Sequence, residues 1–172
     1  MKIIFLDFEG VLVTQASRVI ARLESLTDIQ AFPPAIEALN KILVQTDAQI
    51  VATSSWRSSG MGLVGDLLDK WGAQGRCVDI VPYRRNREEE IQAWISLAAD
   101  ENTYEFELGH LENFAVIDGL DDLGALHPYH FRTDADMGLT EALADRVIAF
   151  LNRQRFLPVD MYRRSRSRFM RD

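Results

Sequence analysis

Two acidic residues near the N-terminus are the most chemically suggestive feature of the sequence. Asp7 and Glu9 follow the apolar run at residues 3–6, and Gly10 comes directly after them. A carboxylate such as that of Asp7 can attack phosphorus and form an aspartyl-phosphate. Alternate side chains of an extended chain lie on one side, so Glu9 could protonate a leaving oxygen and later activate water. The alternative is that Asp7 only caps a turn at a strand end, and these four residues alone do not decide between the two.

Three further apolar runs of strand length are also followed by polar side chains. These are Thr53, Ser54, Ser55 and Arg57 after residues 50–52; Arg84, Arg85 and Arg87 after residues 78–81; and Asp118, Asp121 and Asp122 after residues 114–117. Carboxylates are ligands that suit Mg²⁺, whereas hydroxyl and guanidinium groups suit phosphate oxygens. Ligands of an open parallel sheet bind beyond the carboxyl ends of its strands. The sequence therefore predicts one site for phosphate and a divalent cation.

The elements that must position these groups follow from the spacing of apolar residues. The runs at residues 3–6, 50–52 and 114–117 are continuously apolar, and those at 78–81 and 129–131 are mostly apolar, as in strands that are buried on both faces. Amphipathic helices are expected after Pro33 and Pro34, near residues 62–71, from Asn86 and from Thr140. This alternation predicts an α/β fold: a three-layer α/β/α Rossmann-like domain with five parallel strands. Residues 14–32 could form a helix or a flap, and residues 100–113 have no clear assignment.

Composition limits the class of protein. The chain has 172 residues, of which 47% are hydrophobic and 26% charged, as expected of one globular domain. No apolar run has the length of a membrane span, and the N-terminal residues do not resemble a signal peptide. Cys77 is the only cysteine and cannot form an intramolecular disulfide. These features predict a cytoplasmic protein with no membrane partner.

Charge divides the chain into two parts. Residues 153–172 carry seven arginines against two aspartates, a net charge of +5, which leaves −12 for residues 1–152 out of the total of −7. We therefore expect a globular domain over residues 1–152 and a basic tail over residues 153–172 that is not a separate domain. The tail could contact nucleic acid, or it could be a terminus that pairs with the acidic body.

The motifs resemble those of a known superfamily. FLDFEGVLV (residues 5–13), IVATSSWRSS (50–59) and FAVIDGLDD (114–122) are similar, in order and spacing, to the motifs of the haloacid-dehalogenase (HAD) superfamily. The Ser-Ser-Trp-Arg sequence, the helix start REEEI (87–91) and the late Gly138-Leu139-Thr140 are similar to a narrower group, the small HAD-like domains of multi-enzyme RNA-repair proteins. The resemblance covers residues 1–151 and implies an HAD-like fold. The short spacing between the first two motifs leaves no room for a large cap domain.

The resemblance implies catalytic and metal-binding roles for three acids. Asp7 matches the nucleophile, which is also a ligand of Mg²⁺. Glu9 stands where the superfamily has an aspartate that acts as general acid and base, and where a backbone carbonyl also binds the metal. Asp118 matches the Mg²⁺ ligand of the fourth motif. Two departures, Glu9 in place of Asp and Gly119 in place of a second acid, predict slower turnover, although Asp121 or Asp122 could supply the second acid.

The resemblance also implies a phosphate-binding set. Ser54 matches the phosphate-binding hydroxyl, with Thr53 as the alternative. Arg87 matches the basic residue that balances charge on the phosphoryl group, with Arg85 as the alternative. Arg57 could bind phosphate or organise the site.

The function that these features predict is Mg²⁺-dependent hydrolysis of phosphomonoesters by an HAD-type phosphatase, with polynucleotide ends as candidate substrates. One alternative is a weakly catalytic module that binds phosphate or nucleic acid, which Glu9 and Gly119 would favour. Another is a phosphatase of small metabolites, which the acidic body favours because it repels polyanions. The sequence does not predict the oligomeric state.

Overall fold

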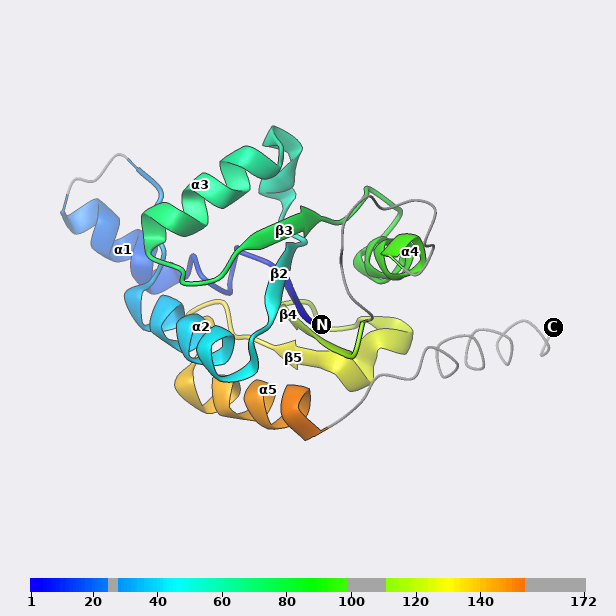
Figure 1. Cartoon of the computed structure of the whole chain (residues 1–172). Coiled ribbons are helices and arrows are strands. Elements are labelled where there is room, and N and C mark those ends of the chain that lie inside the picture. The colour runs from blue at the N-terminus through cyan, green and yellow to red at the C-terminus, as the bar shows by residue number, and fades with distance from the viewer. Residues whose placement is uncertain (25–27, 99–110, 154–172) are drawn as a thin grey trace.

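The computed structural model describes residues 1–24, 28–98 and 111–153 and has the expected three-layer architecture (Figure 1). Its five strands are all parallel and lie in the order β3-β2-β1-β4-β5. They are β1 (Lys2–Leu6), β2 (Gln49–Ala52), β3 (Cys77–Ile80), β4 (Asn113–Asp118) and β5 (His130–Arg132). The five predicted strands and their parallel arrangement are confirmed, with boundaries that differ by one residue or so.

Helices connect the strands as the apolar pattern predicts. They are α1 (Gln15–Leu23), α2 (Pro33–Thr46), α3 (Met61–Trp71), α4 (Arg87–Ala98) and α5 (Glu141–Arg153), with short 3₁₀ helices η1 (Ser55–Ser59) and η2 (Gly124–Tyr129). Prolines occupy the first turn of α2, and Gly72 ends α3 in the left-handed conformation. Asn86 caps α4, because its Oδ1 accepts a hydrogen bond from the Glu89 amide at 2.9 Å.

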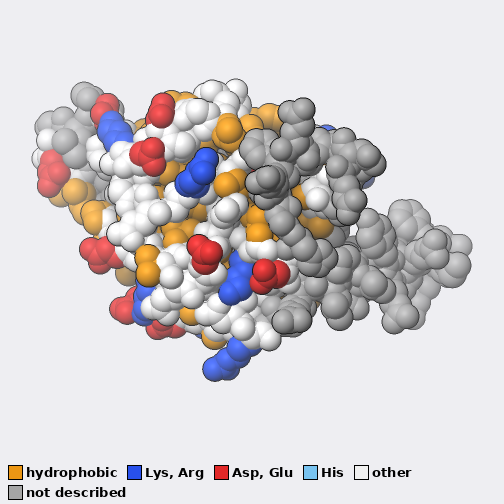
Figure 2. All heavy atoms as spheres, in the orientation of Figure 1, with side chains coloured by type: hydrophobic (Ala, Val, Ile, Leu, Met, Phe, Trp, Pro, Cys, Tyr) orange, Lys and Arg blue, Asp and Glu red, His pale blue; other side chains and the backbone are white. Residues whose placement is uncertain are grey.

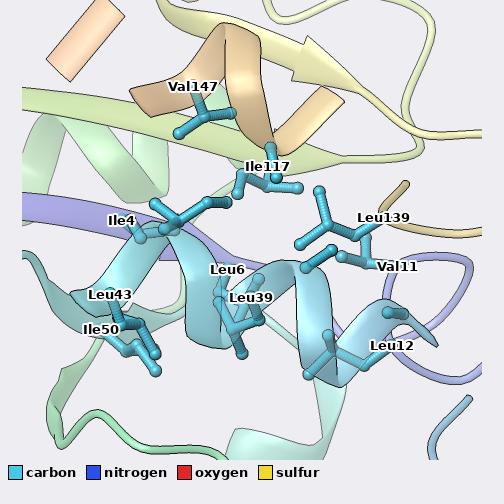
Figure 3. Close-up of a cluster of buried hydrophobic side chains, with 14 of the residues drawn as sticks. Ile4, Leu6, Val11, Leu12, Leu39, Leu43, Ile50, Ile117, Leu139 and Val147 are labelled. Carbon is cyan, nitrogen blue, oxygen red and sulfur yellow. The ribbon is translucent and has the colours of Figure 1, made fainter. Parts of the chain in front are cut away.

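The two faces of the sheet bury different side chains. Ile4 and Leu6 of β1 pack against α2, α3 and α5, and Figure 3 shows them facing Leu39 and Leu43 of α2. The intervening side chain, Phe5, lies in a second cluster on the opposite face with α4. Figure 1 shows α4 and α2 on opposite sides of the sheet. Because side chains alternate along a strand, the first residue after Leu6 belongs to the α4 face.

The connection between β1 and α1 is a tightly bonded loop. The Phe8 carbonyl accepts hydrogen bonds from the amides of residues 11, 12 and 13, and Gly10 adopts a φ of +72°. The amide of Leu139 donates to the Val11 carbonyl at 2.9 Å, so the Gly-Leu-Thr segment holds this loop from outside. The stretch at residues 14–32 contains helix α1, of which only Ser17 is buried. Within the described residues the chain from β1 to β2 thus contains two helices and no cap domain.

Some predictions concern residues that the structure does not describe. Most of the unassigned stretch at residues 100–113 and nearly all of the basic tail lie outside the described residues, so the domain boundary at residue 152 stays a prediction. None of the described helices is both long enough and apolar enough to cross a membrane.

Gly138 provides a test of how this loop is held. Its φ is +67°, and a Cβ there would lie 2.3 Å from the Val11 carbonyl oxygen. We expect Gly138→Ala to lower the free energy of unfolding by about 3 kcal/mol or more, because strain and a backbone clash add together. Gly72→Ala is the matched control, since its φ is +84° and its Cβ would meet no atom within 4 Å. It should cost only about 1–2 kcal/mol in urea unfolding followed by tryptophan fluorescence. Equal losses for the two variants would contradict this role of Gly138.

Candidate active site

The strand register brings three of the chemically active residues together. Leu6 pairs with Ala52 of β2 and with Ile117 of β4. The hydrogen bonds continue one residue further: the Thr53 amide donates to the Leu6 carbonyl at 2.9 Å, and the Asp7 amide donates to the Ile117 carbonyl at 3.1 Å. The next residues on the three central strands are therefore neighbours, and by alternation their side chains lie on the α4 face. They are Thr53, Asp7 and Asp118.

Arg87, the first residue of α4, reaches both carboxylates. Its Nε donates to Asp118 Oδ2 at 2.9 Å, and its Nη2 lies 3.8 Å from Asp7 Oδ1. Its Nη1 donates to the Thr53 carbonyl and lies 3.2 Å from Glu90 Oε2. One guanidinium thus balances two acids while the backbone and Glu90 hold it in place. Arg85, the alternative for this role, has an 84% exposed side chain that pairs with Glu89, so the geometry favours Arg87.

Arg57 is engaged by protein acceptors. Its Nη1 donates to the Thr53 carbonyl and to the Ser54 carbonyl, the latter at 2.9 Å, and its Nη2 lies 2.5 Å from Glu90 Oε1. The guanidinium also lies 4.3 Å from the centre of the Tyr83 ring. Nε is buried without a partner among the described residues. Of the two roles that the sequence left open for this buried residue, the geometry favours organisation of the strand ends over direct contact with phosphate.

The two candidate hydroxyls differ in their surroundings. Ser54 Oγ accepts a hydrogen bond from the Trp56 amide at 3.3 Å and caps η1. Thr53 Oγ1 is buried and has no hydrogen-bond partner among the described residues. A buried hydroxyl without a partner is costly unless a ligand uses it. Of the two hydroxyls that the sequence left open, the surroundings therefore favour Thr53 over Ser54 as a ligand of phosphate.

Burial alters the acidity of Asp7. Removal from water, reinforced by the charge of Asp118, raises the pKa of Asp7 from 3.8 to about 6, against the opposing effect of Arg87. An acid in this environment retains its proton more strongly than one in water. A bound cation would relieve the same repulsion, so the raised pKa marks a place where additional positive charge is favourable.

A cleft opens beside these residues. Its volume is about 540 Å³, and its walls include Asp7, Glu9, Asp118, Gly119 and Arg18. The three acids predicted for catalysis and metal binding thus line one cavity. Arg18, on α1, forms an ion pair with Glu9 through Nη2 and Oε2. A smaller hollow of about 320 Å³ lies between α2 and residues 137–141 and contains none of the predicted site residues.

Comparison with known protein families identifies the family of this chain. The family described as the HAD domain in Swiss Army Knife RNA repair proteins matches residues 3–144. The chain belongs to this HAD family. No curated protein and no solved structure matches it. Membership supports a phosphatase-type function at the level of the superfamily and agrees with the five-stranded Rossmann-like sheet.

The donor set of this HAD domain is compatible with Mg²⁺. Among the described residues no group of three or more His, Cys, Asp or Glu could hold a metal ion. Mg²⁺ usually takes only one or two carboxylates and completes its shell with water and substrate phosphate. Asp7 and Asp118 are such a pair, and no hydrogen bond to the Glu9 carbonyl occurs within the described residues. These three oxygen donors would be the protein ligands.

Neither acid that the sequence offered as a second ligand lines the cleft. Asp121 pairs with Arg132 at 2.5 Å, and Asp122 Oδ1 accepts a hydrogen bond from the Gly124 amide at 2.7 Å. Gly119 itself stands in the cleft wall, where its hydrogen leaves space beside Thr133. The departure at Gly119 is therefore not compensated by the acids that follow it.

Two residues of this HAD domain were not assigned to the site from the sequence. Glu90 connects Arg57 to Arg87, and Arg18 contacts Glu9. Glu90 had a signal: Arg87, Glu90, Ile91 and Trp94 have the spacing of one helical stripe, which places the first two on the sheet side. No sequence pattern indicated Arg18, because its contact with Glu9 depends on the direction in which α1 leaves the loop.

The raised pKa of Asp7 predicts a stabilising substitution. The favourable protonated state is fully populated below pH 3.8, and its contribution is lost as the pH rises through about 6. Above pH 6 the ionised carboxylate costs about 3 kcal/mol in the metal-free protein. We expect Asp7→Asn to raise the free energy of unfolding by roughly this amount at pH 7.5 in EDTA, and by much less at pH 4.5. Asp66→Asn, at an exposed position of α3, is the control for the loss of a carboxylate away from the cleft. A gain for Asp7→Asn that is the same at both pH values would contradict the burial argument.

Proposed function

We propose that this HAD domain hydrolyses phosphomonoesters with the aid of Mg²⁺, through an aspartyl-phosphate on Asp7. The observation that supports this most strongly is the placement of Asp7 and Asp118 around the single guanidinium of Arg87 at the open end of the sheet. Family membership supports the phosphatase class, and the pair of carboxylates in the cleft supports the cation.

The reaction has two steps. An ionised oxygen of Asp7 attacks phosphorus, the bond from phosphorus to the leaving oxygen breaks, and Glu9 gives that oxygen a proton. Glu9 then takes a proton from water, whose oxygen attacks phosphorus. The bond from phosphorus to Asp7 breaks, which releases inorganic phosphate and restores both carboxyl groups. Both acids line the same cleft, as these steps require.

The surrounding groups stabilise charge during these steps. Arg87 offers positive charge beside Asp7, and Thr53 offers a hydroxyl to which no described residue is hydrogen-bonded. Asp7, Asp118 and the Glu9 carbonyl would hold Mg²⁺, which when bound supplies positive charge for the phosphoryl oxygens. Arg57 and Glu90 keep Arg87 and the end of β2 in position.

The substrate class is inferred from the openness of the cleft and from the family to which the chain belongs. The described residues between β1 and β2 form no cap domain, so the cleft can admit a bulky phosphorylated end. The RNA-repair context of the family favours a polynucleotide end over a small metabolite. The ion pair between Arg18 and Glu9 favours a second candidate, a phosphate-binding module with weak catalysis, because it occupies the proposed acid and base.

A phosphatase assay with matched variants tests the proposal. Wild type should release phosphate from an aryl phosphate and from phosphorylated oligonucleotides with Mg²⁺ and not with EDTA. Asp7→Asn should abolish turnover, because an amide is a poor nucleophile, and Glu9→Gln should slow it. Thr53→Val should lower kcat/KM by about tenfold or more, whereas Ser54→Ala should change it by less than about threefold.

Two results of that assay would count against the proposal. Turnover that persists in Asp7→Asn would exclude Asp7 as the nucleophile. Phosphate binding without turnover in every protein, including Glu9→Asp with the shorter acid of the superfamily, would support the binding module instead.

A further inference from the structure

We propose that Arg18 binds a second phosphate group of the substrate, next to the phosphate that reacts at Asp7. The proposal rests on the function proposed above and names its substrate class: a terminal phosphate with a neighbouring phosphate, as in a nucleoside bisphosphate or an oligonucleotide end. It assigns to α1 a role in specificity that the sequence motifs did not indicate.

Arg18 is the one cationic side chain in the wall of the cleft, as far as the described residues show. Its side chain is 55% exposed, whereas those of Arg87 and Arg57 are 15% and 4% exposed and have several protein acceptors. The contact of Arg18 with Glu9 uses only Nη2. A guanidinium has five N–H donors, so Arg18 keeps donors for the paired hydrogen bonds that phosphate accepts.

Helix α1 presents Arg18 from a fixed start. Thr14 and Ser17 form a capping box in which each side chain accepts a hydrogen bond from the other residue's backbone, and both residues are buried. The Gln15 amide donates to the Ala135 carbonyl at 3.1 Å, which ties the first turn to another residue that lines the cleft. Arg18 lies one turn from this anchor, so its reach is confined to the cleft and its rim.

The ion pair with Glu9 can be exchanged for a phosphate. Glu9 and Arg18 are 37% and 55% exposed, and exposed ion pairs contribute little to stability. Phosphate carries more negative charge than a carboxylate and accepts from both arms of the guanidinium. When Arg18 turns to a phosphate, Glu9 is released for proton transfer. Recognition of the second phosphate is thereby connected to the freedom of the acid and base.

The face of the molecule shown in Figure 2 has no extended basic patch among its described side chains. On the face shown in Figure 2, described basic side chains lie singly among acidic ones. Residues 1–152 carry a net charge of −12, which repels a polyanion at long range. Local recognition by one arginine on an anchored helix suits such a surface better than binding along an extended basic patch.

The test compares substrates that differ by one phosphate. For wild type, kcat/KM for a nucleoside 3′,5′-bisphosphate should exceed that for the better of the two monophosphates by about tenfold or more, mostly through KM. Arg18→Gln should remove this ratio, and Arg18→Lys should retain part of it. Arg22→Gln should keep the ratio, because Arg22 has the same charge one turn further along α1 and does not line the cleft. The comparison uses the ratio of kcat/KM for the two substrates, because an effect of the Arg18 substitution on Glu9 would alter both values equally.

A binding measurement separates this inference from the proposed function. Calorimetry on Asp7→Asn should show tighter binding of the bisphosphate than of either monophosphate. The double variant with Arg18→Gln should lose this difference in affinity. If no protein turns over any ester but this Arg18-dependent preference appears, the hydrolase proposal fails and the second phosphate site stands. If turnover occurs and the bisphosphate has no advantage, or keeps it in Arg18→Gln, the second phosphate site is refuted.

A phosphorylated dinucleotide in the same series identifies the source of the phosphate. An Arg18-dependent advantage for the dinucleotide over a mononucleotide supports recognition of a phosphodiester at an oligonucleotide end. An advantage confined to the bisphosphate supports the site with a small nucleotide as its substrate. The absence of an Arg18-dependent advantage in both series contradicts the proposal.

Discussion

The placement of one guanidinium between the half-buried carboxylate of Asp7 and the buried carboxylate of Asp118 is the interaction on which the site depends. Arg87 contacts Asp118 at 2.9 Å and Asp7 at 3.8 Å, and yet the pKa of Asp7 remains raised to about 6. Without Arg87, two acids of adjacent strands would face each other with no counter-charge in a poorly hydrated space. Arg87 is in turn held by the Thr53 carbonyl and by Glu90. The first turn of α4 and the end of β2 are therefore parts of the same charge balance as the proposed nucleophile.

This constraint explains why so much of the fold surrounds a few polar atoms. Arg57 and Glu90 are buried as an ion pair, which contributes little net stability but fixes geometry when every partner is present. On the other side of Asp7, Gly138 and Leu139 hold the loop that contains Glu9 and Gly10. The strand ends supply the reactive groups, and the helices and loops supply the counter-charges and supports that keep those groups close together without a bound ligand.

The sequence predicted what depends on periodicity and chain order. The five strands, the prolines that begin α2, the ends at Gly72 and Asn86, and the placement of Asp7 and Asp118 at strand ends follow from such patterns. The sequence did not determine features that depend on a one-residue shift along a strand or on the path of a loop. Ser54 and Thr53 differ by one position, and only the alternation of β2 and the cap on η1 distinguish them. The contacts of Arg18 and of Asp121 depend on loop paths that no spacing encodes.

The central claim is that Asp7 carries the phosphoryl group, and trapping that intermediate tests it most directly. Borohydride reduces an acyl phosphate to an alcohol, which converts an aspartyl-phosphate to homoserine. Wild type quenched with borohydride during turnover of a phosphomonoester with Mg²⁺ should give a peptide with homoserine at position 7, seen by mass spectrometry. The modification should be absent when substrate is omitted. Continued turnover with an unmodified Asp7, or homoserine at another aspartate, would contradict the account.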